Sequence, residues 1–346
     1  MIRKAGSIVL RIVAVLVLAT VLILMSGASP VEALKAFLYG IFGTANGFAE
    51  VFVRGTPLIF LGLGVAITFK SGFFNLGAEG QLYVGALAAT ATVLGTDGLP
   101  GPLRVVLAGL AAFLAGGLWV FLPAWMKSRL GISETVNTIM FNYIAIMIVG
   151  VAVRSGLQDP EGYLPQSPLL PEGATLPQLA YPTRFHAGTI VAVAAVLAVY
   201  FIMYKTTVGF EMQMVGLNKR AALCTGLPVN RSLILSAIIG GGLAGLAGFN
   251  EVLGVQHRLL EGISSGGGYT AVLVALLAGN HPIRVLFTAL GLAALQVGAA
   301  TMQRSLGVPA SIVDLIIGFI VLMILSSRFS EIWRENHPAG KLRKAG

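Results

Sequence analysis

The sequence predicts an all-α polytopic membrane protein with about ten transmembrane helices, some of them discontinuous. Of its 346 residues, 56% are hydrophobic and only 11% are charged, and the mean hydropathy is +0.87. An ordinary soluble domain carries roughly 25% charged residues, and a soluble fold has no interior large enough for so much apolar surface. The 44 glycines also suit close helix contacts in lipid, where small residues let backbones approach.

The charge and the missing motifs exclude several function classes. The net charge of +9 suits a nucleic-acid binder, but the basic residues are scattered among apolar runs rather than gathered on one face. The single cysteine, Cys224, permits no intrachain disulfide and no thiolate metal cluster, and the four histidines lack metal-ligand spacing. The sequence has no G-x-x-x-x-G-K-[ST] phosphate loop and no plausible catalytic triad. We therefore expect no metal, no cofactor in this chain and no enzymatic activity.

Ten apolar segments follow one another along the chain. They cover residues 8–25, 51–69, 74–95, 103–125, 134–153, 187–204, 233–253, 269–279, 283–301 and 310–327. The first follows Arg3 and Lys4 as in a signal peptide, but its 18 residues are long for a cleaved segment and adequate for a span. We read it as an uncleaved first helix, with a cleaved signal as the alternative. Residues 1–346 then form a single transmembrane domain.

The distribution of lysine and arginine predicts the orientation. With the N-terminus placed in the cytoplasm, sixteen basic residues fall inside and seven outside, which accounts for all 23. Cytoplasmic loops of membrane proteins carry this excess of positive charge. The bias supports ten spans with both termini in the cytoplasm, because an odd number of spans would scramble the distribution.

The stretch Ser71–Gln81, SGFFNLGAEGQ, interrupts the apolar sequence. The apolar runs on either side have about 15 residues each, short of the roughly 20 that a continuous spanning helix needs. Polar side chains at membrane depth are costly unless they face protein or water. We therefore infer a helix break in which Asn75, Glu79 and Gln81 line or brace a path through the membrane. The alternative is a cytoplasmic turn, with Lys70 at the water boundary.

Two segments on the predicted outer side have a distinct character. Residues Val31–Phe42 have the pattern of a short amphipathic helix at the membrane surface. The outer loop of residues 154–186 contains six prolines between Gln158 and Thr183. Proline resists helix formation and supplies no amide donor, so we expect an ordered or semi-rigid loop. It is either a docking surface for an external partner or a simple connector.

A second interrupted region covers residues 249–270, FNEVLGVQHRLLEGISSGGGYT. Asn250 and Glu251 lie at its start, and Gly266–Gly268 precede a short apolar segment. In the predicted orientation this break lies toward the outside and Ser71–Gln81 toward the inside. Paired glycine-interrupted segments in two halves of a chain point to a transport path. We therefore add Asn250 and Glu251 to the candidate path, and we predict an inverted repeat that relates spans two to five to spans seven to ten.

The longest predicted inner loop covers residues 206–231, TTVGFEMQMVGLNKRAALCTGLPVNR. Leu217–Thr225 has the composition of a short helix, ended by Gly226 and Pro228. Two consecutive alanines, Ala221 and Ala222, give it a small, closely approachable face. It either docks into a groove on a cytoplasmic motor protein or is a plain connecting helix.

These motifs carry a family resemblance. SGFFNLGAEGQ followed by LYVGALAAT resembles the signature of bacterial ABC importer permeases for branched-chain amino acids, simple sugars and nucleosides, and Phe74–Gln81 is most similar to the nucleoside permeases. Three more segments agree with this family over nearly the whole chain: Leu130–Ala145, Val215–Arg231 with Gly240–Gly248, and Tyr269–Pro282. Many ABC importers carry E-A-A-x-x-x-G in the transport loop. Here Ala221, Ala222 and Gly226 match, but Arg220 replaces the acid.

The resemblance implies a ten-helix permease in the bacterial cytoplasmic membrane. Its expected partners are a second related permease, an ATP-binding cassette ATPase that holds ATP and Mg²⁺, and an external substrate-binding protein. The candidates for ATPase coupling are Gly216, Asn218, Ala221, Ala222 and Gly226. The leading function is nucleoside import by alternating access. Import of simple sugars or branched-chain amino acids, or a stand-alone secondary carrier, are the alternatives.

Overall fold

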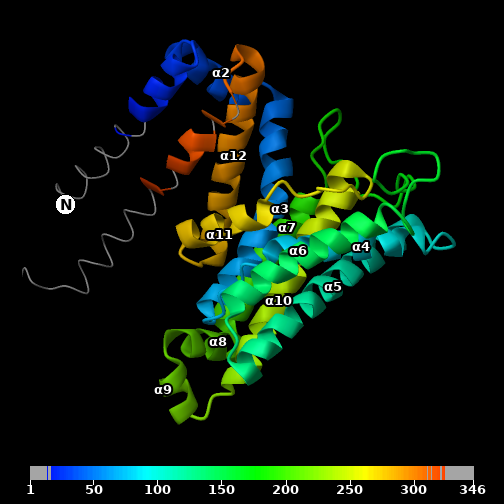
Figure 1. The fold of residues 1–346 in the computed structure, drawn as a ribbon, viewed down its shortest axis with the longest axis vertical. Coiled ribbons are helices and arrows are strands. Elements are labelled where there is room, and N and C mark those ends of the chain that lie inside the picture. Colours follow the sequence, from blue (N-terminus) through cyan, green and yellow to red (C-terminus); the bar gives the residue numbers. More distant parts are fainter. Residues whose placement is uncertain (1–13, 15–16, 310, 313, 320–321, 324–346) are drawn as a thin grey trace, which may run out of the picture. The chain divides into compact units, whose positions relative to one another are not determined.

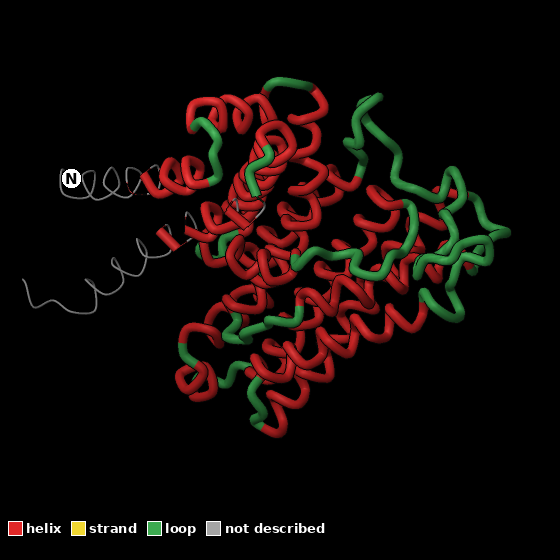
Figure 2. The backbone as a smooth tube through the Cα atoms, turned by 45° about the horizontal axis from the view of Figure 1, so that its top comes forward, coloured by secondary structure: helices red, strands yellow, loops and turns green. Residues whose placement is uncertain are grey.

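The computed structural model describes residues 14, 17–309, 311–312, 314–319 and 322–323. In this part of the chain the regular structure is helical, apart from two isolated β-bridges, as Figures 1 and 2 show. The labelled elements are α2 (Pro30–Phe42), α3 (Ala45–Lys70), α4 (Ala78–Leu94), α5 (Gly101–Leu130), α6 (Glu134–Ala152), α7 (Gly188–Lys205), α8 (Thr207–Leu217), α9 (Lys219–Cys224), α10 (Val229–Asn250), the π-helix η1 (Glu251–Gln256), α11 (Gly267–Ala278) and α12 (Pro282–Leu306). The predicted all-α class is confirmed.

Six of the described helices are long and apolar enough to cross a membrane: α3, α5, α6, α7, α10 with η1, and α12. A seventh is reached if Val17–Met25 and α2, bent by 106° at their break, count as one span. The predicted count of about ten is therefore not confirmed. The difference arises at α4 and α11, which have only 17 and 12 residues, and at the two terminal apolar segments, which lie partly outside the described residues.

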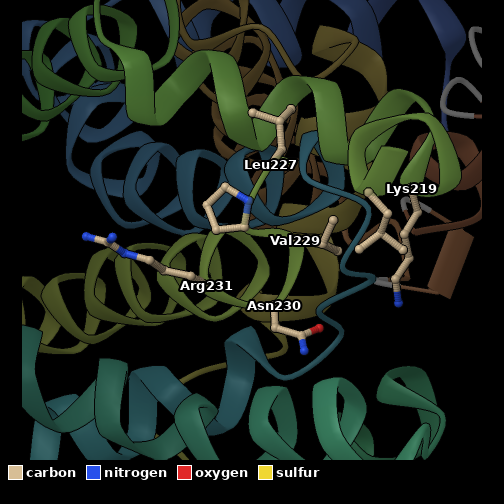
Figure 3. Close-up of a pocket in the computed structure, with 7 residues that line it drawn as sticks. Lys219, Leu227, Val229, Asn230 and Arg231 are labelled. Atoms are coloured by element: carbon tan, nitrogen blue, oxygen red, sulfur yellow. The ribbon is translucent and has the colours of Figure 1, made fainter. Parts of the chain in front are cut away.

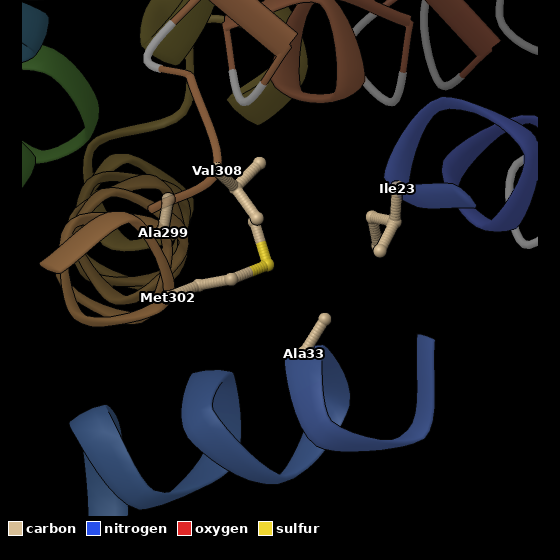
Figure 4. Packing of buried hydrophobic residues seen from close by; sticks show 5 residues of the cluster. All are labelled: Ile23, Ala33, Ala299, Met302 and Val308. Atoms are coloured by element: carbon tan, nitrogen blue, oxygen red, sulfur yellow. The ribbon is translucent and has the colours of Figure 1, made fainter. Parts of the chain in front are cut away.

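The chain divides into two compact units, residues 1–48 with 294–346 and residues 49–293. In the first unit, α2 packs against the C-terminal part of α12. Figure 4 shows the apolar cluster of this unit, to which α2 contributes Ala33, α12 contributes Ala299 and Met302, and the neighbouring segments contribute Ile23 and Val308. The amphipathic helix predicted at Val31–Phe42 is confirmed as α2, and both of these end residues are exposed.

Close helix crossings organise the second unit. Helix α3 is the most buried of its long helices, since 89% of its 18-residue apolar stretch is buried. Glycines pair where α4 and α10 cross, since a Cβ added at Gly85 would lie 2.4 Å from the Cα of Gly245. Helices α5 and α10 meet in the same way at Gly116 and Gly241. A side chain at any of these positions would separate the helices, so the abundance of glycine serves backbone contact.

We expect Gly85→Leu to destabilise the protein by about 3 kcal/mol, because the side chain must force α4 away from α10. Gly291→Ala is the matched control, since nothing lies within 4 Å of a Cβ at that position on α12. Thermal unfolding of the purified chain in detergent compares the two. Equal melting temperatures for both variants would contradict the crossing.

Candidate functional site

The predicted interruption within Ser71–Gln81 is present over residues 71–77, between the end of α3 and the start of α4. Gly72 turns the chain with a φ of +78°, a conformation that favours glycine. Phe73 is then fully buried against Val120, Ala124, Leu233 and Ala237. The turn and the anchored phenylalanine direct the chain back into the packed interior, where α4 begins.

The carboxamides of Asn75 and Gln81 bond to each other across the interrupted segment. Asn75 Nδ2 donates to Gln81 Oε1 at 3.1 Å, and Gln81 Nε2 donates to Asn75 Oδ1 at 3.0 Å. The same Asn75 oxygen accepts a bond from the Gly77 amide at 2.9 Å. Both side chains are fully buried. In this conformation they brace the turn instead of lining an open path.

Helix α6 supplies two residues that the sequence analysis did not single out. Thr138 Oγ1 accepts from the Leu76 amide at 3.2 Å, and Asn142 Oδ1 accepts from the Gly80 amide at 2.8 Å. Asn142 Nδ2 also donates to the Leu76 carbonyl at 2.9 Å. Residues four apart share one helix face, so two polar residues at this spacing in an apolar segment were the available signal. They satisfy backbone groups that the interruption frees.

Glu79 joins the two interrupted regions. Its Oε2 accepts a hydrogen bond of 2.7 Å from the amide of Gly268, in the first turn of α11. A Cβ at Gly268 would lie 2.3 Å from the Glu79 amide nitrogen, so the two backbones are in contact. The first turns of α4 and α11 therefore meet around one buried carboxyl group. Helix N-termini carry partial positive charge, which makes a carboxylate the complementary group between them.

Asn250 and Glu251 lie where α10 passes into η1. Asn250 is fully buried, while Glu251 is partly exposed. Among the described residues, no hydrogen bond links either one to Asn75, Glu79 or Gln81. The structure therefore places three of the five candidate path residues at the first break, where Asn75 and Gln81 bond each other, and the other two at the start of the second.

The proline-rich loop is ordered against the second break. Three backbone amides of the loop donate hydrogen bonds of 2.9 Å to backbone carbonyls of the second break. The pairs are Ser167 to Leu259, Leu170 to His257 and Leu176 to Leu253. The Leu259 amide in turn donates to Ser167 Oγ at 2.9 Å. The expectation of an ordered loop is confirmed, and the loop supplies donors to carbonyl groups in and after η1.

His186, at the end of this loop, is another residue that the sequence analysis missed. It is fully buried, and its Nδ1 accepts from the Gly188 amide at 3.2 Å. Burial lowers the pKa of His186 to about 4, with smaller contributions from His257 and Arg184. The imidazole is therefore neutral at pH 7.

Because the unfolded chain takes up a proton on His186 near pH 6.5 and the folded chain does not, stability must fall as pH decreases from about 6.5 to 4. The largest loss expected from this histidine is about 3 kcal/mol. We expect His186→Gln to flatten this part of the curve of melting temperature against pH. Parallel curves for the two proteins would contradict the assignment.

The predicted inner loop folds into two short helices. Helix α9 confirms the predicted helix, and Asn218 caps it by accepting from the amides of Arg220 and Ala221 at 3.0 and 3.1 Å. Ala222 is buried and Gly226 ends the segment with a φ of +78°. Helix α8 was not predicted. Figure 3 shows the pocket beside α9, lined by Lys219, Leu223, Leu227, Pro228, Val229, Asn230 and Arg231.

Gly216 connects this segment to the first break. A Cβ at Gly216 would lie 2.1 Å from the Lys70 carbonyl oxygen, and Gly72 lies against the Gly216 Cα. The end of α8 is thus in backbone contact with the turn that follows α3.

Apolar helices that are interrupted at a shared buried junction are typical of membrane transport proteins. The chain belongs to the family described as "Branched-chain amino acid transport system / permease component", which it matches over residues 47–325. It is an ABC transporter permease and an integral membrane protein. Such permeases are transport components and not catalytic subunits.

Three relatives match nearly the whole chain. The guanosine ABC transporter permease protein NupP of Bacillus subtilis is 36% identical over 100% of this chain and 99% of its own length. The glucose ABC transporter permease protein TsgB13 of Haloferax volcanii is 35% identical, covering 95% of this chain and 89% of its own. The nucleoside ABC transporter permease protein NupB of Lactococcus lactis is 30% identical, covering 99% and 96%.

Proposed function

We propose that this chain is the membrane permease of an ATP-driven importer of nucleosides. The observation that carries the proposal is the meeting of α4 and α11 at Glu79, because helices that begin inside the protein are typical of transporter binding and gating regions. The choice of nucleosides rests on two full-length relatives that are described as guanosine and nucleoside permeases.

The junction serves as the gate in this proposal. Helix α4 leads from Glu79 toward the proline-rich loop, where a Cβ at Gly101 would touch the Gly173 carbonyl. Helix α11 leads in the other direction, toward His281, whose ring packs on Tyr204 beside Lys70. These opposite directions support the inverted repeat. Separation of the two helix starts opens the path past Asn75, Glu79 and Gln81 to alternate sides.

The segment α8–α9 receives the force of the ATPase. The lining of the pocket beside α9 combines the basic residues Lys219 and Arg231 with apolar side chains. Arg220 occupies the position of the usual acid, so an acidic residue on the partner ATPase is the complementary group. The ATPase binds ATP and Mg²⁺, and its closure moves α8, which presses through Gly216 on the turn after Lys70.

Two further partners belong to this proposal. The loop of residues 154–186, held by backbone bonds on η1 and on the residues that follow it, receives the substrate-binding protein on the outer side. A second, related permease completes the path. The chain lies in the bacterial cytoplasmic membrane with both termini in the cytoplasm, in keeping with the excess of lysine and arginine in the predicted inner loops.

Uptake of labelled guanosine by cells that express the complete transporter tests the proposal, with unlabelled adenosine, ribose, glucose and leucine as competitors. We expect competition by adenosine only. Competition by glucose or ribose instead would establish the sugar importer, which the Haloferax volcanii relative favours. Uptake that needs no partner ATPase would point to a secondary carrier.

A further inference from the structure

At the junction of α10 and η1, several buried polar atoms have no hydrogen-bond partner in the described structure. They include both atoms of the Asn250 carboxamide and Nε2 of His186. Both side chains are fully buried. An unsatisfied buried polar group costs about 1–3 kcal/mol, so a native protein rarely retains several together without a use for them.

Both side chains lie against Gly188, and the imidazole also lies against Gly254. A Cβ added at Gly188 would lie 2.1 Å from Asn250 Oδ1 and 2.8 Å from His186 Nδ1. A Cβ at Gly254, in η1, would lie 2.9 Å from His186 Nε2. The imidazole is therefore held between two glycines, one at the start of α7 and one in η1. Neither glycine has a side chain that would hinder the separation of these elements.

The hydrogen-bonding capacity of the pair is defined. His186 Nδ1 accepts from the Gly188 amide, so in the neutral imidazole Nε2 carries the hydrogen and is a donor. Asn250 offers one donor and one acceptor side by side in a planar group. Such a carboxamide matches the edge of a nucleobase that presents an adjacent donor and acceptor.

We propose that Asn250 and His186 form a recognition subsite for the base of a nucleoside, closed in this conformation and exposed when η1 separates from the start of α7. The π-helix η1 supports this assignment, because π-helical turns are frequent at functional sites. The ligand is neutral and planar, with the carboxamide on its donor–acceptor edge and the imidazole donating to a further acceptor. This inference rests on the proposed nucleoside transport.

The test is a competition in proteoliposomes that contain the complete transporter. Guanosine, which presents N1–H and O6 on its base edge, competes with purine riboside, which lacks both groups. Because the delivery protein and the ATPase are the same in every arm, a changed uptake ratio must arise in the permease. We expect Asn250→Leu, which removes both the donor and the acceptor of the carboxamide, to lower the preference for guanosine over purine riboside at least about tenfold, equivalent to about 1.4 kcal/mol.

Further variants and a control complete this experiment. His186→Phe should also reduce the preference, and Asn250→Ser serves if Asn250→Leu does not assemble. Ser236→Ala is the control, because within the described part of the chain this buried hydroxyl bonds only to its own helix, and its ratio should equal that of the wild type. A shift in the ratio of guanosine to 2′-deoxyguanosine instead would mean that the pair reads ribose, and would overturn the assignment to the base.

Unchanged ratios in assembled Asn250 and His186 variants would also overturn the inference and leave a structural water site as the use of these groups. Failure of the wild-type transporter to take up any nucleoside is a different result, which refutes the proposed function itself.

Discussion

Glu79→Ala is expected to lower nucleoside uptake at least tenfold per assembled transporter. The substitution removes the acceptor that holds the Gly268 amide at 2.7 Å. It also removes the charge between the first turns of α4 and α11. A hydrogen bond to an ionised group contributes about 1.5–3 kcal/mol, and about 1.4 kcal/mol corresponds to a factor of ten.

Glu79→Gln separates the two contributions. Its amide oxygen still accepts from Gly268, but the charge at the two helix N-termini is lost. We expect an uptake rate between those of the wild type and Glu79→Ala. Glu32→Gln, which alters an exposed carboxylate in the first turn of α2, is the matched control and should have no effect. Wild-type uptake by assembled Glu79→Ala would refute the gating role of the junction.

Gly216→Ala is expected to uncouple ATP hydrolysis from transport. Within a helix, alanine is favoured over glycine by about 1 kcal/mol, so local preference alone predicts a harmless change. The tertiary contact predicts the opposite, because the new Cβ would lie 2.1 Å from the Lys70 carbonyl oxygen. Helix α8 must then move away from the turn after α3 and lose its direct connection to the gate.

The measurement is the number of nucleosides imported per ATP hydrolysed in proteoliposomes. We expect a drop of about tenfold, which corresponds to about 1.4 kcal/mol of lost coupling. Gly291→Ala, also a helical glycine but without a neighbour within 4 Å, should retain the wild-type ratio. A normal ratio in Gly216→Ala would show that the force reaches the gate by another route.

The sequence was informative where the chemistry of a residue conflicts with its surroundings. Asn75, Glu79 and Gln81 stand out because polar groups in an apolar stretch need partners, and the helix does break at this place. It was less informative for α8, whose mixed composition has no clear period. Thr206, which caps this helix by accepting from the Gly209 amide, was a local signal that we did not use.

Composition and spacing by themselves determined the membrane class, the two interrupted regions and the short helix α9, because hydrophobicity, glycine content and capping residues act locally along the chain. Only the tertiary structure decided that Glu79 bonds to Gly268, that Thr138 and Asn142 hold the first break, and that Gly216 touches Lys70. These contacts join residues far apart in sequence. They depend on how closely two backbones approach, which no local pattern records.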